Sequence, residues 1–141
     1  MRLELTRRYS FSASHRLHSP QLSEEENQRI YGKCNNPYGH GHNYIVEVTL
    51  TGTPDSATGM IAHLRDLDQF VTQEVLEPFD HTYLNKDVEA FRERVPTTEN
   101  LCIEIFDRLK AFPKARLVRI RLEETGRNSF EYAGELEGSR K

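Results

Sequence analysis

The strongest structural signal in this sequence is the alternation of apolar and polar side chains over residues 43–52. Its apolar members are Tyr44, Val46, Val48 and Leu50, and the polar residues between them include Glu47, Thr49 and Thr51. A period of two places successive side chains on opposite faces of a β-strand, so this stretch predicts a strand with one buried face. Such a strand needs neighbouring strands and a second layer to cover its apolar face.

The remaining elements follow from similar patterns. Residues 3–14 alternate more loosely and predict a long first strand, whereas the polar, turn-rich residues 19–33 predict a loop. Apolar residues spaced three and four apart predict two amphipathic helices. The first has the stripe Leu64, Leu67, Val71 and Val75 and ends before Pro78; the second starts at Pro96 and has the stripe Leu101, Ile105 and Leu109. Two strands follow, one with Val118, Ile120 and Leu122 facing inward and one marked by Phe130 and Tyr132.

This order, β-β-α-α-β-β, predicts an α+β fold in which a four-stranded antiparallel sheet carries two helices on one face. A length of 141 residues suits one domain over 1–141, with residues 137–141 as a frayed tail. The net charge of −3 provides no basic surface for nucleic acid. No apolar stretch is long enough to cross a membrane and the N-terminus has no apolar signal segment, so we expect a protein of the reducing cytoplasm.

Two histidines separated by one glycine form the clearest chemical motif. In an extended segment, the side chains of His40 and His42 leave the same face about 7 Å apart, so both imidazoles can bind one metal ion. The alternative is a pair of ordinary surface histidines. A third ligand could be either His15 or His18, because both follow the first predicted strand and the spacing does not choose between them. Three histidines and an open position describe a catalytic zinc site better than a structural one.

The two cysteines have different surroundings. Cys34 lies among polar and turn-forming residues just before the histidine pair, so it is a candidate fourth ligand, base or nucleophile whose pKa a nearby cation would lower. Its other reading is a small buried apolar residue. Cys102 lies on the apolar stripe of the second predicted helix, and we assign it to the core.

Two further sites carry carboxylates. Asp80 precedes His81, and this pair is either a turn with an exposed imidazole or a carboxylate that sets the tautomer of a proton-relaying histidine. Glu124 continues the inward-facing series of its strand, so it needs an arginine or a ligand with N–H donors unless the strand has already ended. Thr98 and Glu99 can be explained by helix capping alone.

The sequence resembles the 6-pyruvoyltetrahydropterin synthase family over nearly its whole length. The matching segments, in order, are Phe11–Pro20, Gly32–Tyr44, Gly59–Met60, Asp80–His81 with Leu84–Asn85, Pro96–Asn100 and Glu124–Thr125. Five residues separate Cys34 from His40, as in synthases of the tetrahydrobiopterin route, whereas the 6-carboxytetrahydropterin synthases of the queuosine route usually have three. One departure is His63, which stands where relatives often carry aspartate or asparagine and leaves the entry of the first helix open.

The resemblance implies specific roles. Zinc would be bound by His15, His40 and His42, and the proton-abstracting base would be Cys34, which would work with Asp80 and His81. The pterin would be anchored by Glu124, with Thr97, Thr98 and Glu99 as a second contact. The implied fold is the T-fold (tunnelling fold), assembled as a homohexamer of two stacked trimers whose sheets close into a barrel with sites between subunits.

The resemblance also implies a reaction. The substrate would be the small-molecule pterin 7,8-dihydroneopterin triphosphate, and the products 6-pyruvoyltetrahydropterin and triphosphate, with no external redox cofactor. Two alternatives are a 6-carboxytetrahydropterin synthase, which releases a two-carbon fragment from the same substrate, and a non-catalytic pterin- or zinc-binding paralogue. No partner of another kind is expected, neither nucleic acid nor membrane.

Overall fold

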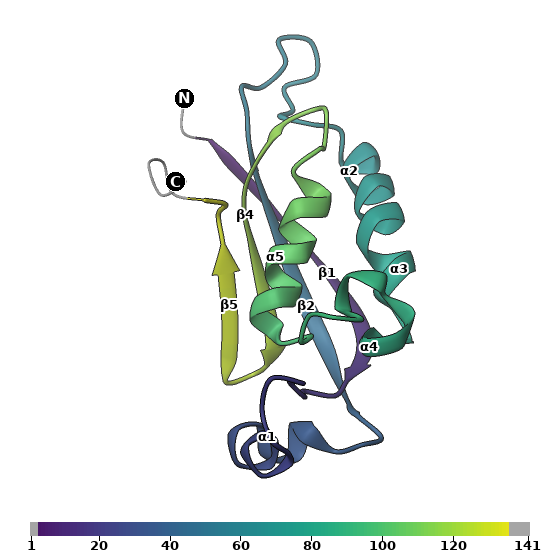
Figure 1. Ribbon diagram of the computed structural model, residues 1–141. Coiled ribbons are helices and arrows are strands. Elements are labelled where there is room, and N and C mark those ends of the chain that lie inside the picture. The colour runs from purple at the N-terminus through teal and green to yellow at the C-terminus, as the bar shows by residue number, and fades with distance from the viewer. Residues whose placement is uncertain (1–2, 136–141) are drawn as a thin grey trace.

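The computed structural model of the protein describes residues 3–135, so the predicted frayed tail, residues 137–141, lies outside the described residues. Its centre is a five-stranded sheet with the order β3-β1-β2-β4-β5 (Figure 1). The strands are β1 (Glu4–His15), β2 (His40–Thr51), β3 (Thr82–Tyr83), β4 (Arg116–Thr125) and β5 (Asn128–Tyr132). The four long strands pair antiparallel as predicted. The structure adds β3, which pairs parallel to β1 through two residues and makes the sheet mixed.

Two long helical segments cover one face of this sheet (Figure 1). The first consists of α2 (Leu64–Val71), a π-helical turn (Thr72–Leu76) and α3 (Glu77–Phe79). The second is α5 (Thr98–Leu109). Short elements between them are α4 (Leu84–Asp87) and a 3-10 turn (Glu89–Phe91). Within residues 3–135, no helix is long and apolar enough to cross a membrane.

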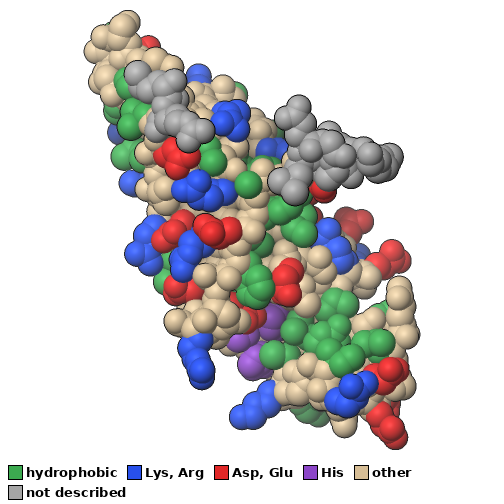
Figure 2. Space-filling view, turned by 90° about the vertical axis from the view of Figure 1, so that its left-hand side faces the viewer, with side chains coloured by type: hydrophobic (Ala, Val, Ile, Leu, Met, Phe, Trp, Pro, Cys, Tyr) green, Lys and Arg blue, Asp and Glu red, His purple; other side chains and the backbone are tan. Residues whose placement is uncertain are grey.

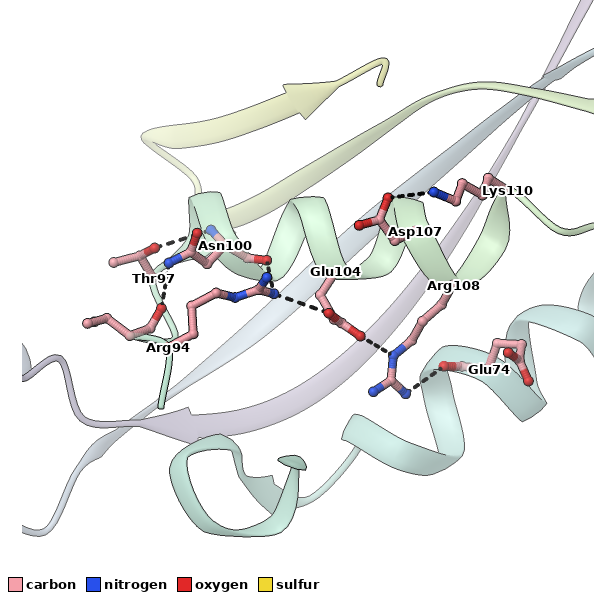
Figure 3. A network of polar contacts seen from close by, with 9 residues as sticks. Glu74, Arg94, Thr97, Asn100, Glu104, Asp107, Arg108 and Lys110 are labelled. Atoms are coloured by element: carbon pink, nitrogen blue, oxygen red, sulfur yellow. Dashed lines mark hydrogen bonds and ion pairs between the residues drawn. The ribbon is translucent and has the colours of Figure 1, made fainter. Parts of the chain in front are cut away.

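The expected end of the first helix before Pro78 was wrong, because the helix continues to Phe79. A proline inside a helix lacks the N–H that would bind the carbonyl four residues earlier, here that of Glu74. The chain widens into the π-helical turn just before Pro78, and Arg108 Nη1 donates to the Glu74 carbonyl oxygen at 3.3 Å (Figure 3). At the other end, His63 caps α2, since its side chain accepts a hydrogen bond from the Arg65 N–H.

The prediction of a loop over residues 19–33 was also wrong. Residues Glu24–Tyr31 form helix α1, which a 3-10 turn, Gly32–Asn35, follows. Ser23 and Glu26 form a capping box at its start, a signal present in the sequence. The sequence of this helix has no apolar stripe, since the one residue it buries is Asn27. The side-chain amide of Asn27 forms hydrogen bonds with backbone groups of Ser19 and Ser23.

The core lies between the sheet and its covering helices. From β2, the alternating residues Tyr44, Val46, Val48 and Leu50 are all buried as predicted. From β4, the buried residues are Leu117, Ile120 and Leu122. Val118 was predicted to face inward but is only half-buried, because a register shift opposite Thr49 and Leu50 changes the alternation of β4. Cys102 is buried in α5, which confirms its assignment to the core.

Candidate functional site

Three histidines meet where β1 ends and β2 begins. His15 is the cross-strand partner of His40, and His42 lies two residues further along β2 on the same face. The ring centroids of His40 and His42 are 4.6 Å apart, and those of His15 and His42 are 5.0 Å apart. Figure 2 shows histidine side chains in a hollow between the body of the molecule and its lower lobe. The antiparallel register of the two strands therefore brings together residues 25 positions apart in the chain.

The orientation of His15 is set by a backbone carbonyl. Its side chain is fully buried, and its Nδ1 lies 2.9 Å from the carbonyl oxygen of Pro96. A carbonyl oxygen only accepts hydrogen bonds, so Nδ1 carries the proton and Nε2 keeps its lone pair. Burial lowers the pKa of His15, which favours the neutral imidazole that metals bind. The hydroxyl of Tyr44, 3.4 Å from the same Nδ1, adds a second polar neighbour.

His18, the alternative third ligand, lies elsewhere. Its Nδ1 is 3.1 Å from the side-chain amide nitrogen of Asn35, which also donates to the Leu17 carbonyl oxygen. This contact holds the segment after β1 against the 3-10 turn, and His18 belongs to neither group of converging ligand atoms found in the described residues. The structure thus brings His15, and not His18, to the histidine pair.

Cys34 lies beside the histidines, in the 3-10 turn. Its Sγ is 3.5 Å from His40 Nε2, and its carbonyl oxygen accepts a hydrogen bond from the Leu17 N–H at 2.7 Å. Burial, and to a smaller extent the carboxylate of Glu124, raises the pKa of the Cys34 thiol. The protein side chains alone therefore favour the neutral thiol, and a cation nearby would lower the pKa of Cys34 again.

A glycine lets the chain pass close to β1 and β3 just before β2 begins. Gly39 has φ of 75°, in the left-handed region that favours glycine. A Cβ at this position would lie 2.9 Å from the Tyr83 ring and 3.2 Å from the carbonyl oxygen of His15. Any larger residue would therefore push the start of β2 away from His15.

Glu124 reaches the same hollow from β4. Its side chain is 15% exposed, and its Oε2 lies 3.6 Å from His42 Nε2 and accepts a hydrogen bond from Thr98 Oγ1 at 2.5 Å. The other carboxylate oxygen accepts from Asn128 Nδ2 at 3.2 Å. The prediction that Glu124 points inward is confirmed. Two neutral donors hold this carboxylate, and no arginine of the described residues forms an ion pair with it.

The other residues before α5 have simpler positions. Thr97 is the N-cap of α5 and accepts a hydrogen bond from the Asn100 N–H at 3.2 Å, while Glu99 is exposed in the first turn. Both positions fit capping chemistry. Thr98, in contrast, is buried and faces Glu124.

Asp80 and His81 form a pair at the edge of the sheet, next to β3. Asp80 Oδ2 lies 3.0 Å from His81 Nδ1, and Asp80 Oδ1 accepts from the Ser12 N–H, which lowers the pKa of Asp80. His81 has φ of 59° and its side chain is 83% exposed. In the described part of the chain, neither residue hydrogen-bonds Cys34. The pair is assembled, but its imidazole faces outward.

The donor atoms of the hollow fit a metal ion. Within residues 3–135, His15, Cys34 and His40 form one group of ligand atoms that lie within 4.8 Å of one another, and His15, His42 and Glu124 form another. The Nε2 atoms of His15 and His42 are buried and have no hydrogen-bond partner. A buried polar atom without a partner is unfavourable, so a cation that accepts these lone pairs would stabilise the site.

Comparisons with known proteins agree with this arrangement. The family model for 6-pyruvoyl tetrahydropterin synthase matches residues 4–135. The chain belongs to this family. It is 52% identical to the 6-pyruvoyl tetrahydrobiopterin synthase of Poecilia reticulata and 48% identical to that of Homo sapiens. These alignments cover 93% and 94% of this chain and 90% and 92% of the relatives.

A solved structure extends the likeness to three dimensions. The 6-pyruvoyl tetrahydropterin synthase of Caenorhabditis elegans is 44% identical and superposes with a TM-score of 0.89, with 94% of this chain and 96% of the other covered. The fold is therefore that of the 6-pyruvoyl tetrahydropterin synthases, and the protein is an enzyme of the lyase type.

Three contributors to the site were not predicted from the sequence. The Pro96 carbonyl orients His15, the Tyr44 hydroxyl lies beside the same imidazole, and Asn128 supports Glu124. Tyr44 could have been found, because it shares the face of His40 and His42 at the same spacing of two. Asn128 could also have been found, because it lies only four residues after Glu124, across the turn between β4 and β5. The Pro96 contact depends instead on how the segment before α5 packs against the end of β1, which no local pattern encodes.

Proposed function

We propose that this protein is a zinc-dependent synthase that converts 7,8-dihydroneopterin triphosphate to 6-pyruvoyltetrahydropterin with elimination of triphosphate. The observation that carries the proposal is the convergence of two unpartnered buried imidazole nitrogens with the Cys34 thiol and the Glu124 carboxylate in one hollow. The names of the relatives support the same activity.

His15, His40 and His42 would hold the zinc ion through imidazole nitrogens, with His15 fixed by Pro96. When bound, zinc would supply a Lewis acid that polarises oxygens of the substrate side chain, and a positive charge that opposes the rise in the pKa of Cys34. The fixed tautomer of His15 means that one ligand needs no rearrangement before it binds metal.

Glu124 would bind the pterin ring. The aminopyrimidine edge of a pterin presents neighbouring N–H donors, and a carboxylate accepts two such hydrogen bonds side by side. Thr98 and Asn128 each donate to one oxygen of Glu124, so the carboxylate is already oriented in the free protein. Thr97 and Glu99, next to Thr98, would add contacts to the ring from the start of α5.

Cys34 would remove a proton from the substrate side chain next to the pterin ring. Its sulfur lies beside His40, within reach of a substrate whose ring rests on Glu124 near His42. Asp80 would hold His81 in one tautomer, so that its ring can relay protons. Because the His81 ring is exposed at the sheet edge, we infer that it serves a site completed by a second copy of the chain.

We further propose that the protein assembles as a homohexamer of two stacked trimers, which agrees with this inference. In the described residues, β3 covers the outer edge of β1 only at Ala13 and Ser14, and β5 is the other edge strand. Open edges expose unpaired backbone groups, which closure of several sheets into a barrel would pair. We further propose that the enzyme acts in the cytoplasm.

One experiment tests the proposal and separates it from its rivals. Purified protein is analysed for metal, then incubated with 7,8-dihydroneopterin triphosphate, and every product is identified. We expect bound zinc, free triphosphate and 6-pyruvoyltetrahydropterin. Release of acetaldehyde would instead identify a 6-carboxytetrahydropterin synthase, and binding without any product would identify a non-catalytic paralogue.

A further inference from the structure

A second hollow adjoins the histidines at His40. This cleft, of about 530 Å³, is lined by residues of α1, the 3-10 turn and the start of β2. Its polar lining includes Gln28, Lys33, Asn35, Asn36 and His40. Because His40 also belongs to the candidate metal group, the cleft is continuous with that site.

The charge of this cleft favours an anion. None of its lining residues is a carboxylate, although the whole chain has a net charge of −3. Lys33 is exposed and, among residues 3–135, forms no ion pair. A second cation lies close by, since Arg16 Nε donates to the Asn35 carbonyl oxygen at 3.1 Å. Asn36 uses its side-chain oxygen to accept from the Tyr38 N–H, which leaves its amide N–H groups available to a ligand.

One feature opposes an anion here. Helix α1 ends at Tyr31, so its carboxyl end, with partial negative charge, lies next to the cleft. The Gly32 N–H already donates to the Gln28 carbonyl oxygen and satisfies part of this end. A full positive charge on Lys33 outweighs the remaining partial charge, which is about half an elementary charge at most.

The order of the sites matches the order of groups in the proposed substrate. Glu124 lies 3.6 Å from His42, Cys34 lies 3.5 Å from His40, and the cleft begins at His40. A pterin triphosphate has a ring at one end, a three-carbon chain in the middle and the phosphates at the other end. With the ring on Glu124 and the carbon chain at the histidines, the phosphates extend toward the cleft.

We propose that this cleft binds the triphosphate group of the substrate, with Lys33 as its main cationic contact. The inference rests on the proposed function, because it takes the pterin on Glu124 as its starting point. A lysine and several amide groups suit a flexible chain of phosphates, which carries many acceptor oxygens and no fixed planar geometry. The cleft then determines specificity for a phosphorylated side chain.

The test is a titration of the zinc-containing protein with inorganic tripolyphosphate. A zinc-responsive dye reports any metal that tripolyphosphate removes from the protein. The dissociation constant is taken only from titrations in which the protein keeps its zinc. We expect Lys33→Met to weaken tripolyphosphate binding about tenfold, as expected for the loss of one charge-assisted contact, and Lys33→Arg to retain it. The matched control is Lys114→Met. Lys114 is exposed and lies just before the start of β4, at the other end of the strand from Glu124, so this variant should bind tripolyphosphate like the unmodified protein.

A second ligand distinguishes loss of the subsite from general damage. Binding of 7,8-dihydroneopterin, which has no phosphates, should be the same in Lys33→Met and the unmodified protein. The proposal is overturned if tripolyphosphate fails to bind at millimolar concentration, if Lys33→Met binds it as well as Lys114→Met, or if Lys33→Met weakens both ligands equally. Failure of the unmodified protein to turn over the substrate would refute the proposed function, whereas the tripolyphosphate titration would still decide the cleft.

Discussion

The Nδ1 atom of His15 donates a hydrogen bond of 2.9 Å to the carbonyl oxygen of Pro96, and this contact decides which nitrogen of the imidazole can bind a metal. Pro96 itself has no N–H, but its carbonyl lies just before α5, whose N-cap is Thr97. The start of one helix thereby orients a side chain at the end of β1. His15 is buried, so a free Nε2 lone pair there has no alternative partner in water.

Replacement of His15 should therefore remove the metal. We expect His15→Gln to lose stoichiometric zinc binding while the fold persists, because glutamine fills much of the same volume without an imidazole nitrogen. The control is His18→Gln, which should keep its zinc because His18 contacts Asn35. Metal analysis after gel filtration, with circular dichroism as a check of folding, measures both. Full zinc content in His15→Gln would refute the ligand assignment.

The two cysteines provide a matched pair for the proposed base. We expect Cys34→Ala to keep zinc and to reduce turnover by about a thousandfold, within the usual range for loss of a general base. Burial raises the pKa of Cys102 to about 12, so this thiol is inert, and Cys102→Ala should lose about 1 kcal/mol of stability and keep its activity. Turnover is followed by triphosphate release. Normal turnover by Cys34→Ala would exclude Cys34 as the base.

Glu124 and Glu123 are neighbours on β4 with different surroundings. Glu124 is held by Thr98 and Asn128, whereas Glu123 lies 3.8 Å from Arg121. We expect Glu124→Gln to raise the pterin dissociation constant about ten- to a hundredfold, the range for a lost charge-assisted hydrogen bond, with zinc retained. Glu123→Gln should leave pterin binding unchanged. Fluorescence titration measures both, and equal affinities for the two variants would count against the anchoring role.

Much of the fold was accessible from the sequence because β2 and α5 present clean periods of two and of three to four. The capping box of α1 was present but was outweighed by the absence of an apolar stripe, since the helix buries only Asn27. The register shift in β4 and the two-residue strand β3 depend on contacts between distant segments. Local patterns do not contain this information.

The candidate site, like the fold, could be predicted from the sequence only in part. The close spacing of His40 and His42 was readable, and so was the inward direction of Glu124. The choice between His15 and His18 depends on the pairing of β1 with β2, which places His15 directly opposite His40. The exposed position of His81 depends on the positive φ at that residue and on where β3 joins the sheet.

Asp68 provides a test of stability against pH. Its carboxylate accepts hydrogen bonds from Arg7 and Tyr9, and these, chiefly the one from Arg7, lower the pKa of Asp68 below its ordinary value. A lowered folded-state pKa stabilises the protein at every pH above the unfolded value, and this contribution disappears as pH falls through the folded value. We expect Asp68→Asn to be less stable at neutral pH, with the difference shrinking below about pH 4.

Urea unfolding of Asp68→Asn between pH 7 and 3 measures this difference. The control is Asp66→Asn, on the same helix, where Asp66 is exposed and forms no ion pair in the described residues. A stability difference for Asp68→Asn that stayed constant across the acid range would show that the carboxylate charge is not the cause.

Glu104 lies on α5 and binds two arginines, one from the segment before this helix and one from the helix itself. It accepts hydrogen bonds from Arg94 Nη2 at 3.1 Å and Arg108 Nε at 2.8 Å (Figure 3). The Arg108 guanidinium also lies over the Phe79 ring. The side chain of Glu104 is 18% exposed, so Glu104→Gln leaves two guanidinium groups without their carboxylate in a partly buried setting.

We expect Glu104→Gln to lower the free energy of unfolding by about 1–3 kcal/mol, the range for a hydrogen-bonded charge. Because Arg94 also donates to the Asn100 carbonyl oxygen beside the segment that carries Pro96, the variant should bind zinc more weakly. Asp107→Asn, which removes the exposed pair with Lys110 on the same helix, is the control and should change stability by less than about 0.5 kcal/mol. Equal losses in urea unfolding for both variants would mean that the Glu104 network adds nothing beyond an ordinary surface ion pair.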